Sequence, residues 1–237
     1  MKRILISLFA VVSVLTGVIT GCGGETSGSG NLTTKSYEFS GFTMIEAENG
    51  FTFTVKQSQS YKIEITTDDN VLNYLDIALK GNTLKIGLSG GNVRPTALRA
   101  EISMPGLEGI NLSGGARAAI SGFNSNESFS VTLTGGSVLT GDIVSGDVGI
   151  GISSGSMVTL TGSGRDLLAR SSNGSEITLE EFPVNNADIN IDDGGRSFIN
   201  INGKLDTVLT GGSELYYTGD PEMGNVNVSG GSVLEKR

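Results

Sequence analysis

The amino-acid sequence predicts an all-β protein, a right-handed parallel β-helix in which short coils stack on one another. Three observations carry this prediction: a glycine turn that recurs at a fixed period, alternating apolar and polar residues beside each turn, and a composition rich in glycine but poor in proline. The chain has 237 residues, with 36 Gly and 4 Pro. This suits one large domain and excludes collagen-like and proline-rich sequences.

The turn motif occurs seven times, and its third residue is always glycine. Successive glycines are 21, 19, 19, 20, 18 and 19 residues apart. A fixed period of this length is typical of stacked repeats, so we expect about seven coils of ~19 residues. The constant glycines are Gly115, Gly136, Gly155, Gly174, Gly194, Gly212 and Gly231.

The residues around each constant glycine suit a corner between strands. The preceding position holds Gly, Ser, Asn or Asp, which tolerate a left-handed backbone. The Ser, Thr or Asp two positions before the glycine is expected to bond its own backbone at the corner. The motif therefore has a complete structural explanation without a ligand.

Alternating apolar pairs on both sides of the turns predict the core. Period two indicates strands whose inward faces line up from coil to coil. The weaker members are Leu139/Gly141 and Ala169/Ser171. The predicted core pairs before the turns are Ile110/Leu112, Val131/Leu133, Ile150/Ile152, Ile189/Ile191 and Val226/Val228, and those after the turns are Ala118/Ile120, Val158/Leu160, Ile177/Leu179 and Leu215/Tyr217.

The length of one repeat indicates the shape of the coil. Nineteen residues at ~3.3 Å each give a perimeter near 60 Å, which suits three short strands with turns. Parallel pairing at ~4.8 Å would make seven coils roughly 30 Å long, and the crossover rule favours a right-handed path. The competing architecture is a β-sandwich with irregular hairpins, although hairpin folds rarely keep one turn motif seven times.

Residues 37–237 are expected to form one β-helical head domain, with the glycine-turn repeats beginning at about residue 107. The stretch before them alternates over 51–55, 61–66, 83–88 and 98–104, which predicts four strands. Asp68-Asp69-Asn70 is expected to open a short helical turn through residue 77. Pro105-Gly106 then turns the chain into the repeats.

The N-terminus reads as an export signal that ends in a lipidation site. Lys2 and Arg3 precede an apolar stretch, and Ile19-Thr20-Gly21-Cys22 resembles the bacterial lipobox. We expect residues 1–21 to be a lipoprotein signal peptide, Cys22 to be lipidated, and residues 22–36 to be a flexible tether. The head would then be extracytoplasmic, lipid-anchored to the cell membrane or the outer membrane. The alternative is an uncleaved membrane anchor.

Charge and residue types exclude several function classes. The net charge is −9, and loss of the two cations of the leader would make it −11. An acidic surface argues against nucleic acid as a partner. The chain has no His and one Cys, so zinc, haem and histidine-dependent catalysis are not expected. Gly151-Ile152-Ser153-Ser154-Gly155 matches a hydrolase nucleophile motif, but that motif needs a His base. We predict no catalytic residue, no metal ligand and no cofactor.

Two acidic pairs and several aromatic residues are candidate sites. Asp192-Asp193, beside Asp188, suits a cation or polysaccharide cleavage by paired acids, but one acidic corner among seven is more simply a solvated turn. Asp68-Asp69 receives the same interpretation. The arginines are scattered, namely Arg94, Arg99, Arg165, Arg170 and Arg196. The aromatic residues that could supply a stacking face for sugars, or fill the core and corners, are Phe123, Phe129, Phe182, Phe198, Tyr216 and Tyr217.

The sequence resembles the head GIN domain family of auto-transporter adhesins, found in bacterial envelope proteins. The resemblance rests on Gly109-Ile110-Asn111-Leu112-Ser113-Gly114-Gly115, on the later Thr-Gly-Gly-Ser copies, and on the strand pattern of residues 42–86. It covers the chain from Tyr37 to the C-terminus. It implies a fold similar to right-handed β-helices and an adhesin-like role, and it implies no catalytic residues.

We therefore expect a non-enzymatic, lipid-anchored envelope protein whose head binds a surface, glycan or protein partner. One alternative is a polysaccharide lyase or hydrolase on the same scaffold, and another is a purely structural envelope component. The ligand, the oligomeric state and any cation at Asp192 and Asp193 stay open.

Overall fold

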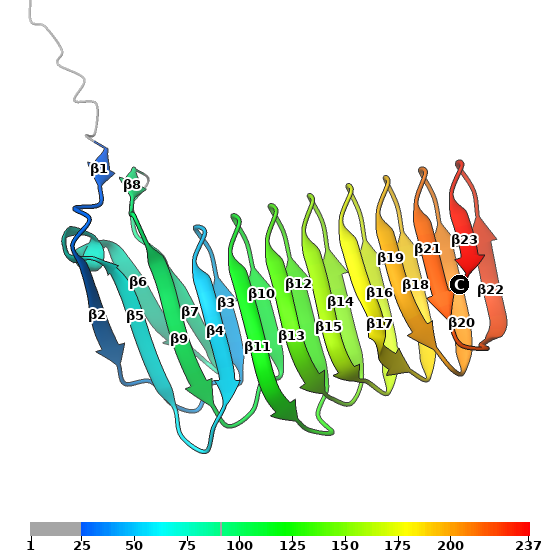
Figure 1. Cartoon of the computed structure of the whole chain (residues 1–237), viewed down its shortest axis with the longest axis horizontal. Helices are drawn as coiled ribbons and strands as arrows, with labels where there is room; N and C mark the ends of the chain where they lie inside the picture. The colour runs from blue at the N-terminus through cyan, green and yellow to red at the C-terminus, as the bar shows by residue number, and fades with distance from the viewer. Residues whose placement is uncertain (1–24, 91) are drawn as a thin grey trace, which may run out of the picture.

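The structure, a computed structural model, describes residues 25–90 and 92–237 and is a β-solenoid (Figure 1). About 62% of it is strand and 3% is helix. Two large sheets run the length of the molecule, and the apolar core lies between them. This confirms the predicted fold class of stacked parallel β-coils. The leader and Cys22 lie outside the described residues.

One sheet has ten strands, nearly all parallel. Neighbouring strands pair residue for residue along the repeats, so inward-facing residues form continuous columns. The order across this sheet is β22 (Glu222–Val228), β20 (Lys204–Leu209), β18 (Asn186–Ile191), β16 (Asp166–Ser171), β14 (Val148–Ile152), β12 (Phe129–Leu133), β10 (Gly109–Leu112), β3 (Met44–Ala47), β7 (Thr83–Leu88) and β6 (Leu75–Lys80).

The other sheet has eleven strands and faces the first across the core. Strands β1 (Thr26–Ser27) and β8 (Val93–Arg94) form a separate two-stranded sheet. The order across the eleven-stranded sheet is β2 (Leu32–Tyr37), β5 (Lys62–Asp68), β9 (Leu98–Met104), β4 (Thr52–Gln57), β11 (Arg117–Asn124), β13 (Val138–Val144), β15 (Met157–Ser163), β17 (Glu176–Val184), β19 (Arg196–Ile201), β21 (Glu214–Thr218) and β23 (Val233–Lys236).

Each regular coil contains two strands, one from each sheet, where the coil length suggested three. Seven such pairs follow one another from β10/β11 to β22/β23. The expected third corner is absorbed into the long strands after the glycine turns. There Gly141 and Gly162 have φ of 148° and 118°, and an added Cβ would lie 2.0 Å from a carbonyl oxygen of the previous coil. Such glycines bend a strand without ending it.

The N-terminal end of the solenoid is built out of chain order. Along the chain, the coil β3/β4 comes first and is followed by β5, the 3₁₀ helix η1 (Asp69–Tyr74) and β6. It returns as β7 and β9, which pair in parallel with β3 and β4. Strands β5 and β6 cover the returning strands in antiparallel pairing, and β2 lies outermost. Antiparallel strands thus close this end of the parallel stack (Figure 1).

The folded head begins earlier than the expected tether boundary at residue 36. Strand β1 pairs with β8, and all six residues of β2 pair with β5. Most residues of Leu32–Tyr37 are polar, so the sequence pattern did not distinguish an edge strand from a linker. Residues 26–37 therefore belong to the closing layer of the solenoid.

The glycine corners are tight turns with positive φ at both central residues. Gly211 and Gly212 have φ of 67° and 75°, and Asp193 adopts 46° at the same position as Gly211. Positive φ at both positions defines a type I′ turn. The turns also bond to one another, because the N–H of Gly136 donates to the carbonyl of Ser154 at 3.0 Å and that of Gly155 to Asn173 at 3.1 Å. The corners therefore form a ladder of their own.

In three of the turns the hydroxyl that closes the turn belongs to the residue after the constant glycine, namely Ser137, Ser156 and Ser213, which corrects the expectation. Ser137 Oγ donates to the carbonyl of Thr134 at 2.7 Å, and Ser156 Oγ donates to that of Ser153 at 2.7 Å. Both serines are fully buried. The hydroxyl two positions before the glycine is left on the outside of the coil.

The predicted core columns are confirmed, except at the last coil. Side chains such as Val158 and Ile177 are at most 1% exposed. Val226 and Val228 occupy the same columns on β22, yet they are 42% and 39% exposed because β22 is the edge strand of its sheet. Tyr217 is partly buried against the core.

Candidate functional site

A groove crosses the outer face of the ten-stranded sheet and is centred on β14. Two hollows of about 610 Å³ each adjoin there, joined by a smaller one of about 150 Å³ that shares residues with both. Gly149 and Gly151 line the middle of the groove. They are the outward-facing residues of β14, because Val148, Ile150 and Ile152 fill the core.

The groove is hollow because its central strand lacks outward side chains. Gly149 pairs with Ser130 and Leu168, and Gly151 pairs with Thr132 and Arg170 on the neighbouring strands. A Cβ atom added at either glycine would meet nothing within 4 Å. The backbone does not need glycine at these positions, since neither residue has a left-handed φ.

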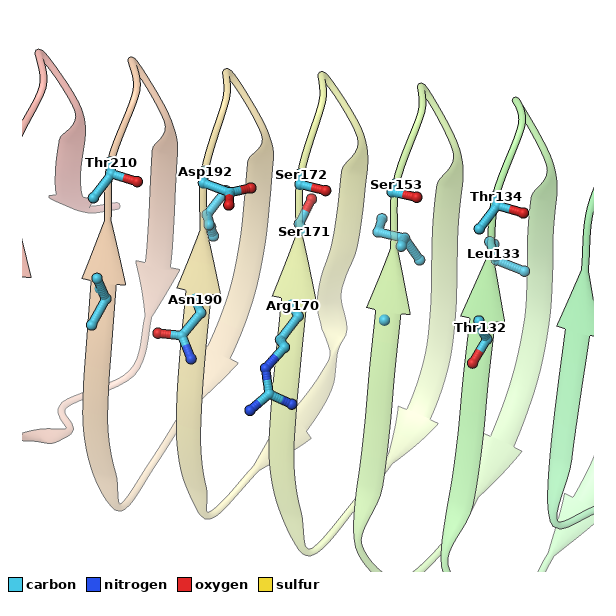
Figure 2. A pocket seen from close by; sticks show the side chains of 14 residues that line it. Thr132, Leu133, Thr134, Ser153, Arg170, Ser171, Ser172, Asn190, Asp192 and Thr210 are labelled. Atoms are coloured by element: carbon cyan, nitrogen blue, oxygen red, sulfur yellow. The ribbon is translucent and has the colours of Figure 1, made fainter.

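One half of the groove is lined by hydroxyl, amide and guanidinium groups and by the carboxylate of Asp192. Figure 2 shows Thr132 on β12, with β14 between it and Arg170 on β16, and Asn190 on the adjacent strand β18. A row of short polar side chains lies beside them, next to the turns (Figure 2), and its members are Thr134, Ser153, Ser172, Asp192 and Thr210. This half can donate and accept hydrogen bonds along its length.

The other half of the groove carries carboxylates that are bonded to neighbouring side chains or backbone. Asp147 accepts two hydrogen bonds from Arg165, at 2.7 and 2.6 Å, and these bonds hold the pKa of Asp147 below its ordinary value. Asp166 accepts from both the backbone and the side-chain nitrogen of Asn186. Glu108 accepts from Thr43 Oγ1 at 2.9 Å.

The two acidic pairs lie in different environments in the structure. Asp192 and Asp193 are both exposed at a corner, and Asp192 lines the groove. Asp68 is fully buried, which corrects its interpretation as a solvated turn. Within residues 25–90 and 92–237, no group of three or more His, Cys, Asp or Glu is placed to hold a metal ion.

Asp68 fastens the closing layer of the solenoid. Its carboxylate accepts hydrogen bonds from Gly30 N, Thr96 N and Thr96 Oγ1, each at 2.7 Å. Burial raises its pKa, and these hydrogen bonds lower it by more, so the pKa lies below the ordinary value. Its partners are 28 and 38 residues away in sequence, so local patterns gave no signal for this role.

The aromatic residues do not form an open stacking face. Phe123, Phe129 and Phe182 are buried in the core. Phe198 and Tyr216 stack on each other, with ring centroids 5.3 Å apart, and the Arg237 guanidinium lies 4.0 Å from the Tyr216 ring centroid. The turn that contains Ser153 leads into strand β15, whereas the hydrolase nucleophile motif requires a helix after its serine.

Sequence reasoning missed the groove and one copy of the turn. The turn Asn49-Gly50 has φ of 61° and 72° and opens β4, but the inserted strands separate it from the regular period. The signal for the groove was present as two glycines at outward positions of an otherwise apolar strand. Arg170 was counted only as one of several scattered arginines.

A family model described as "Putative auto-transporter adhesin, head GIN domain" matches residues 41–221. The chain belongs to this family. The match spans the solenoid from the coil before the regular repeats to the turn before β22, so the whole groove lies inside the family domain.

Solved structures share this fold of the family. A "putative adhesin" from Bacteroides fragilis is 19% identical with a TM-score of 0.83, and the alignment covers 89% of this chain and 99% of that one. Another from Parabacteroides merdae is 19% identical with a TM-score of 0.73, covering 90% and 99%. A "putative lipid binding protein" from Parabacteroides distasonis is 18% identical with a TM-score of 0.72, covering 90% and 100%. No curated protein matches the sequence.

Proposed function

We propose that this chain is a non-enzymatic, lipid-anchored envelope protein whose adhesin-like head binds a glycan or protein partner through the groove on β14. Membership of an adhesin family and the adhesin-like fold support the binding role. The observation that carries the choice of surface is the open floor at Gly149 and Gly151, which no backbone constraint explains.

The anchor part of the proposal rests on Ile19-Thr20-Gly21-Cys22 after an export-type leader. In the described part of the chain no helix is long and apolar enough to cross a membrane. We expect Cys22→Ser to abolish incorporation of an alkyne-labelled fatty acid and to release the protein from washed membranes. Labelling of the Cys22→Ser variant equal to that of the parent chain would contradict lipidation at this residue.

The binding part is tested by screening the head against glycan and protein arrays. We expect a ligand whose signal is lost when Gly151→Val fills the floor of the groove. Gly106 serves as a matched control, since it is another position where an added Cβ meets nothing within 4 Å and φ is not left-handed, outside the groove. Equal binding by Gly151→Val and Gly106→Val would show that the partner uses another surface.

A second candidate function is polysaccharide cleavage, because Glu108, Asp147 and Asp166 line one end of the groove. General acid catalysis by a carboxyl group usually requires a raised pKa. The pKa of Asp147 is lowered by Arg165, which weakens this candidate. Release of new reducing ends or of unsaturated sugars by the parent chain, and not by Glu108→Gln, would establish it.

A further inference from the structure

The two glycines in the floor of the groove destabilise strand β14. Val148-Gly149-Ile150-Gly151-Ile152 has three apolar residues facing the core and two glycines facing solvent. Glycine weakens a strand interior, because it costs more conformational entropy and packs no side chain. Since an added Cβ at Gly149 or Gly151 meets nothing within 4 Å, larger residues would fit there. What the two glycines provide is a flat, open strip of backbone.

Arg170 lines the groove and has no carboxylate partner among the ion pairs of the described residues. Arg170 pairs in register with Gly151 on one side and Asn190 on the other. Three cations on or beside this sheet have carboxylate partners, namely Lys85 with Glu46, Arg165 with Asp147 and Lys204 with Asp206, whereas Lys80 at the far β6 edge has none among the ion pairs of the described residues. Among the ion pairs of the described residues, none includes Arg170. Its guanidinium is exposed beside the bare floor.

The charges at the two ends restrict the ligand to one anionic group. A guanidinium binds a carboxylate in a planar, two-bonded arrangement. The far end of the groove is lined by Glu108, Asp147 and Asp166, Asp192 lines the same half as Arg170, and the whole chain carries a net charge of −9. A ligand with closely repeated anions would meet these carboxylates, so a single carboxylate at the Arg170 end is the complementary charge.

The position of the groove in the sheet favours a saccharide over an extended peptide. Strand β14 is paired with β12 on one side and β16 on the other, so its backbone has no free edge for a peptide to extend. The groups that remain are side-chain hydroxyls and amides, such as Thr132 and Asn190, beside the apolar surface of Leu168. Sugar hydroxyls match the polar groups, and the C–H face of a sugar ring matches the flat floor.

We propose that the groove binds a saccharide bearing one carboxylate, with the carboxylate held by Arg170 and the adjoining sugar ring lying over Gly149 and Gly151. This inference rests on the proposed function, in which the head binds its partner through this groove. The carboxylate has two chemical sources, a terminal sialic-acid-type sugar or a uronate, and both would be read by the same guanidinium.

The test compares saccharides that differ in the carboxylate. We would measure dissociation constants of the lipid-free head by titration calorimetry for 3′-sialyllactose against lactose, and for glucuronosyl-xylobiose against xylotriose. We expect at least one acidic member to bind at least tenfold more tightly than its neutral partner, and that member identifies the source of the carboxylate. We expect trigalacturonate, which carries an anion on every sugar, to bind more weakly than that member.

Two variants assign the binding to the groove. We expect Arg170→Gln to remove the tenfold preference, whereas Arg117→Gln keeps it, because Arg117 is an exposed arginine on the eleven-stranded sheet and removes the same charge. Gly151→Val should lose binding while its melting temperature is equal or higher, since valine favours strands. This variant separates loss of the site from loss of the fold.

Three results would overturn the inference. They are equal binding of the acidic and neutral members of both pairs, an unchanged preference in Arg170→Gln, and no binding of any of these saccharides. The proposed function is tested separately. It requires only that the arrays reveal a partner of some class and that Gly151→Val loses binding to that partner. A protein ligand found there would refute the saccharide and leave the binding role in place.

Discussion

Ser197 places a hydroxyl group in a column of apolar side chains. It pairs with Ile177 on one side and Leu215 on the other, and it is fully buried. Its Oγ has no hydrogen-bond partner within the described residues. A buried polar group without a partner loses its hydration and gains nothing in return.

We therefore predict that Ser197→Ala stabilises the head by about 1 kcal/mol, the usual scale for relieving such a group. The free energy of unfolding from urea denaturation measures it. The control is Ser137→Ala, which removes the buried bond to the Thr134 carbonyl and should destabilise by a similar amount. A loss of stability in both variants would show that Ser197 is hydrogen-bonded in solution.

The buried carboxylate of Asp68 makes the stability of the head depend on pH. Its pKa is lowered in the folded state because hydrogen bonds to Thr96 and Gly30 outweigh the effect of burial. A group of this kind contributes stability in full above its unfolded pKa, which is ~3.9. The contribution is lost as pH falls through the lower, folded pKa.

We predict that Asp68→Asn lowers the melting temperature at pH 7, because the amide NH₂ would face a donor from Gly30 or Thr96. The difference from the parent chain should stay constant between pH 6 and 8 and shrink as pH falls below about 4. Melting curves across this range measure it, with the exposed Asp76→Asn as control. A difference that grows toward acid pH would contradict the lowered pKa.

At the scale of elements, period-two patterns and the glycine spacing were sufficient to predict the coils and the core. Strands 83–88 and 98–104 were predicted at the bounds that β7 and β9 have. The number of strands per coil was wrong, because the long strands continue through Gly141 and Gly162, and the need for glycine there depends on close backbone approach between coils. The groove was missed for a related reason: Gly149 and Gly151 have meaning only once their neighbours across the sheet are known.

Val158 tests the column assignment on which the coil description rests. It lies between Leu139 and Ile177 in register and is 1% exposed. We predict that Val158→Asp unfolds the repeats, since an unpaired carboxylate in the core costs several kcal/mol. The next residue provides a control, because Thr159 is exposed and Thr159→Asp should change the melting temperature little. Unchanged circular dichroism and melting in Val158→Asp would refute the assignment.

At the scale of the whole molecule, the chain order and the spatial order differ only at the N-terminal end. The regular coils follow the sequence, so their stacking could be predicted from spacing alone. The closing layer could not, because β7 and β9 enter between β3/β4 and strands that precede them in the chain. Contacts such as those of Asp68 with Thr96 hold that layer through long-range partners. The result is a solenoid with two unlike ends.

The unlike ends predict a gradient of local stability along the axis. In a solenoid each coil is stabilised mainly by its two neighbours, so a coil with one neighbour opens most easily. All seven residues of β22 are exposed, whereas β5 and β6 cover the returning coil β7/β9 at the other end. We predict by amide hydrogen exchange that β22 and β23 exchange fastest, that β14 to β17 exchange slowest, and that β7 and β9 stay close to the slow group.

The same experiment on Asp68→Asn locates the effect of the buried carboxylate. If Asp68 fastens only the closing layer, exchange should accelerate in β2, β5 and β9 while β14 to β17 keep their protection, because coupling decays from coil to coil. Uniform acceleration along the chain would instead mean that the head unfolds as one cooperative unit. In that case β22 in the parent chain would exchange as slowly as the central coils, and the gradient would be refuted.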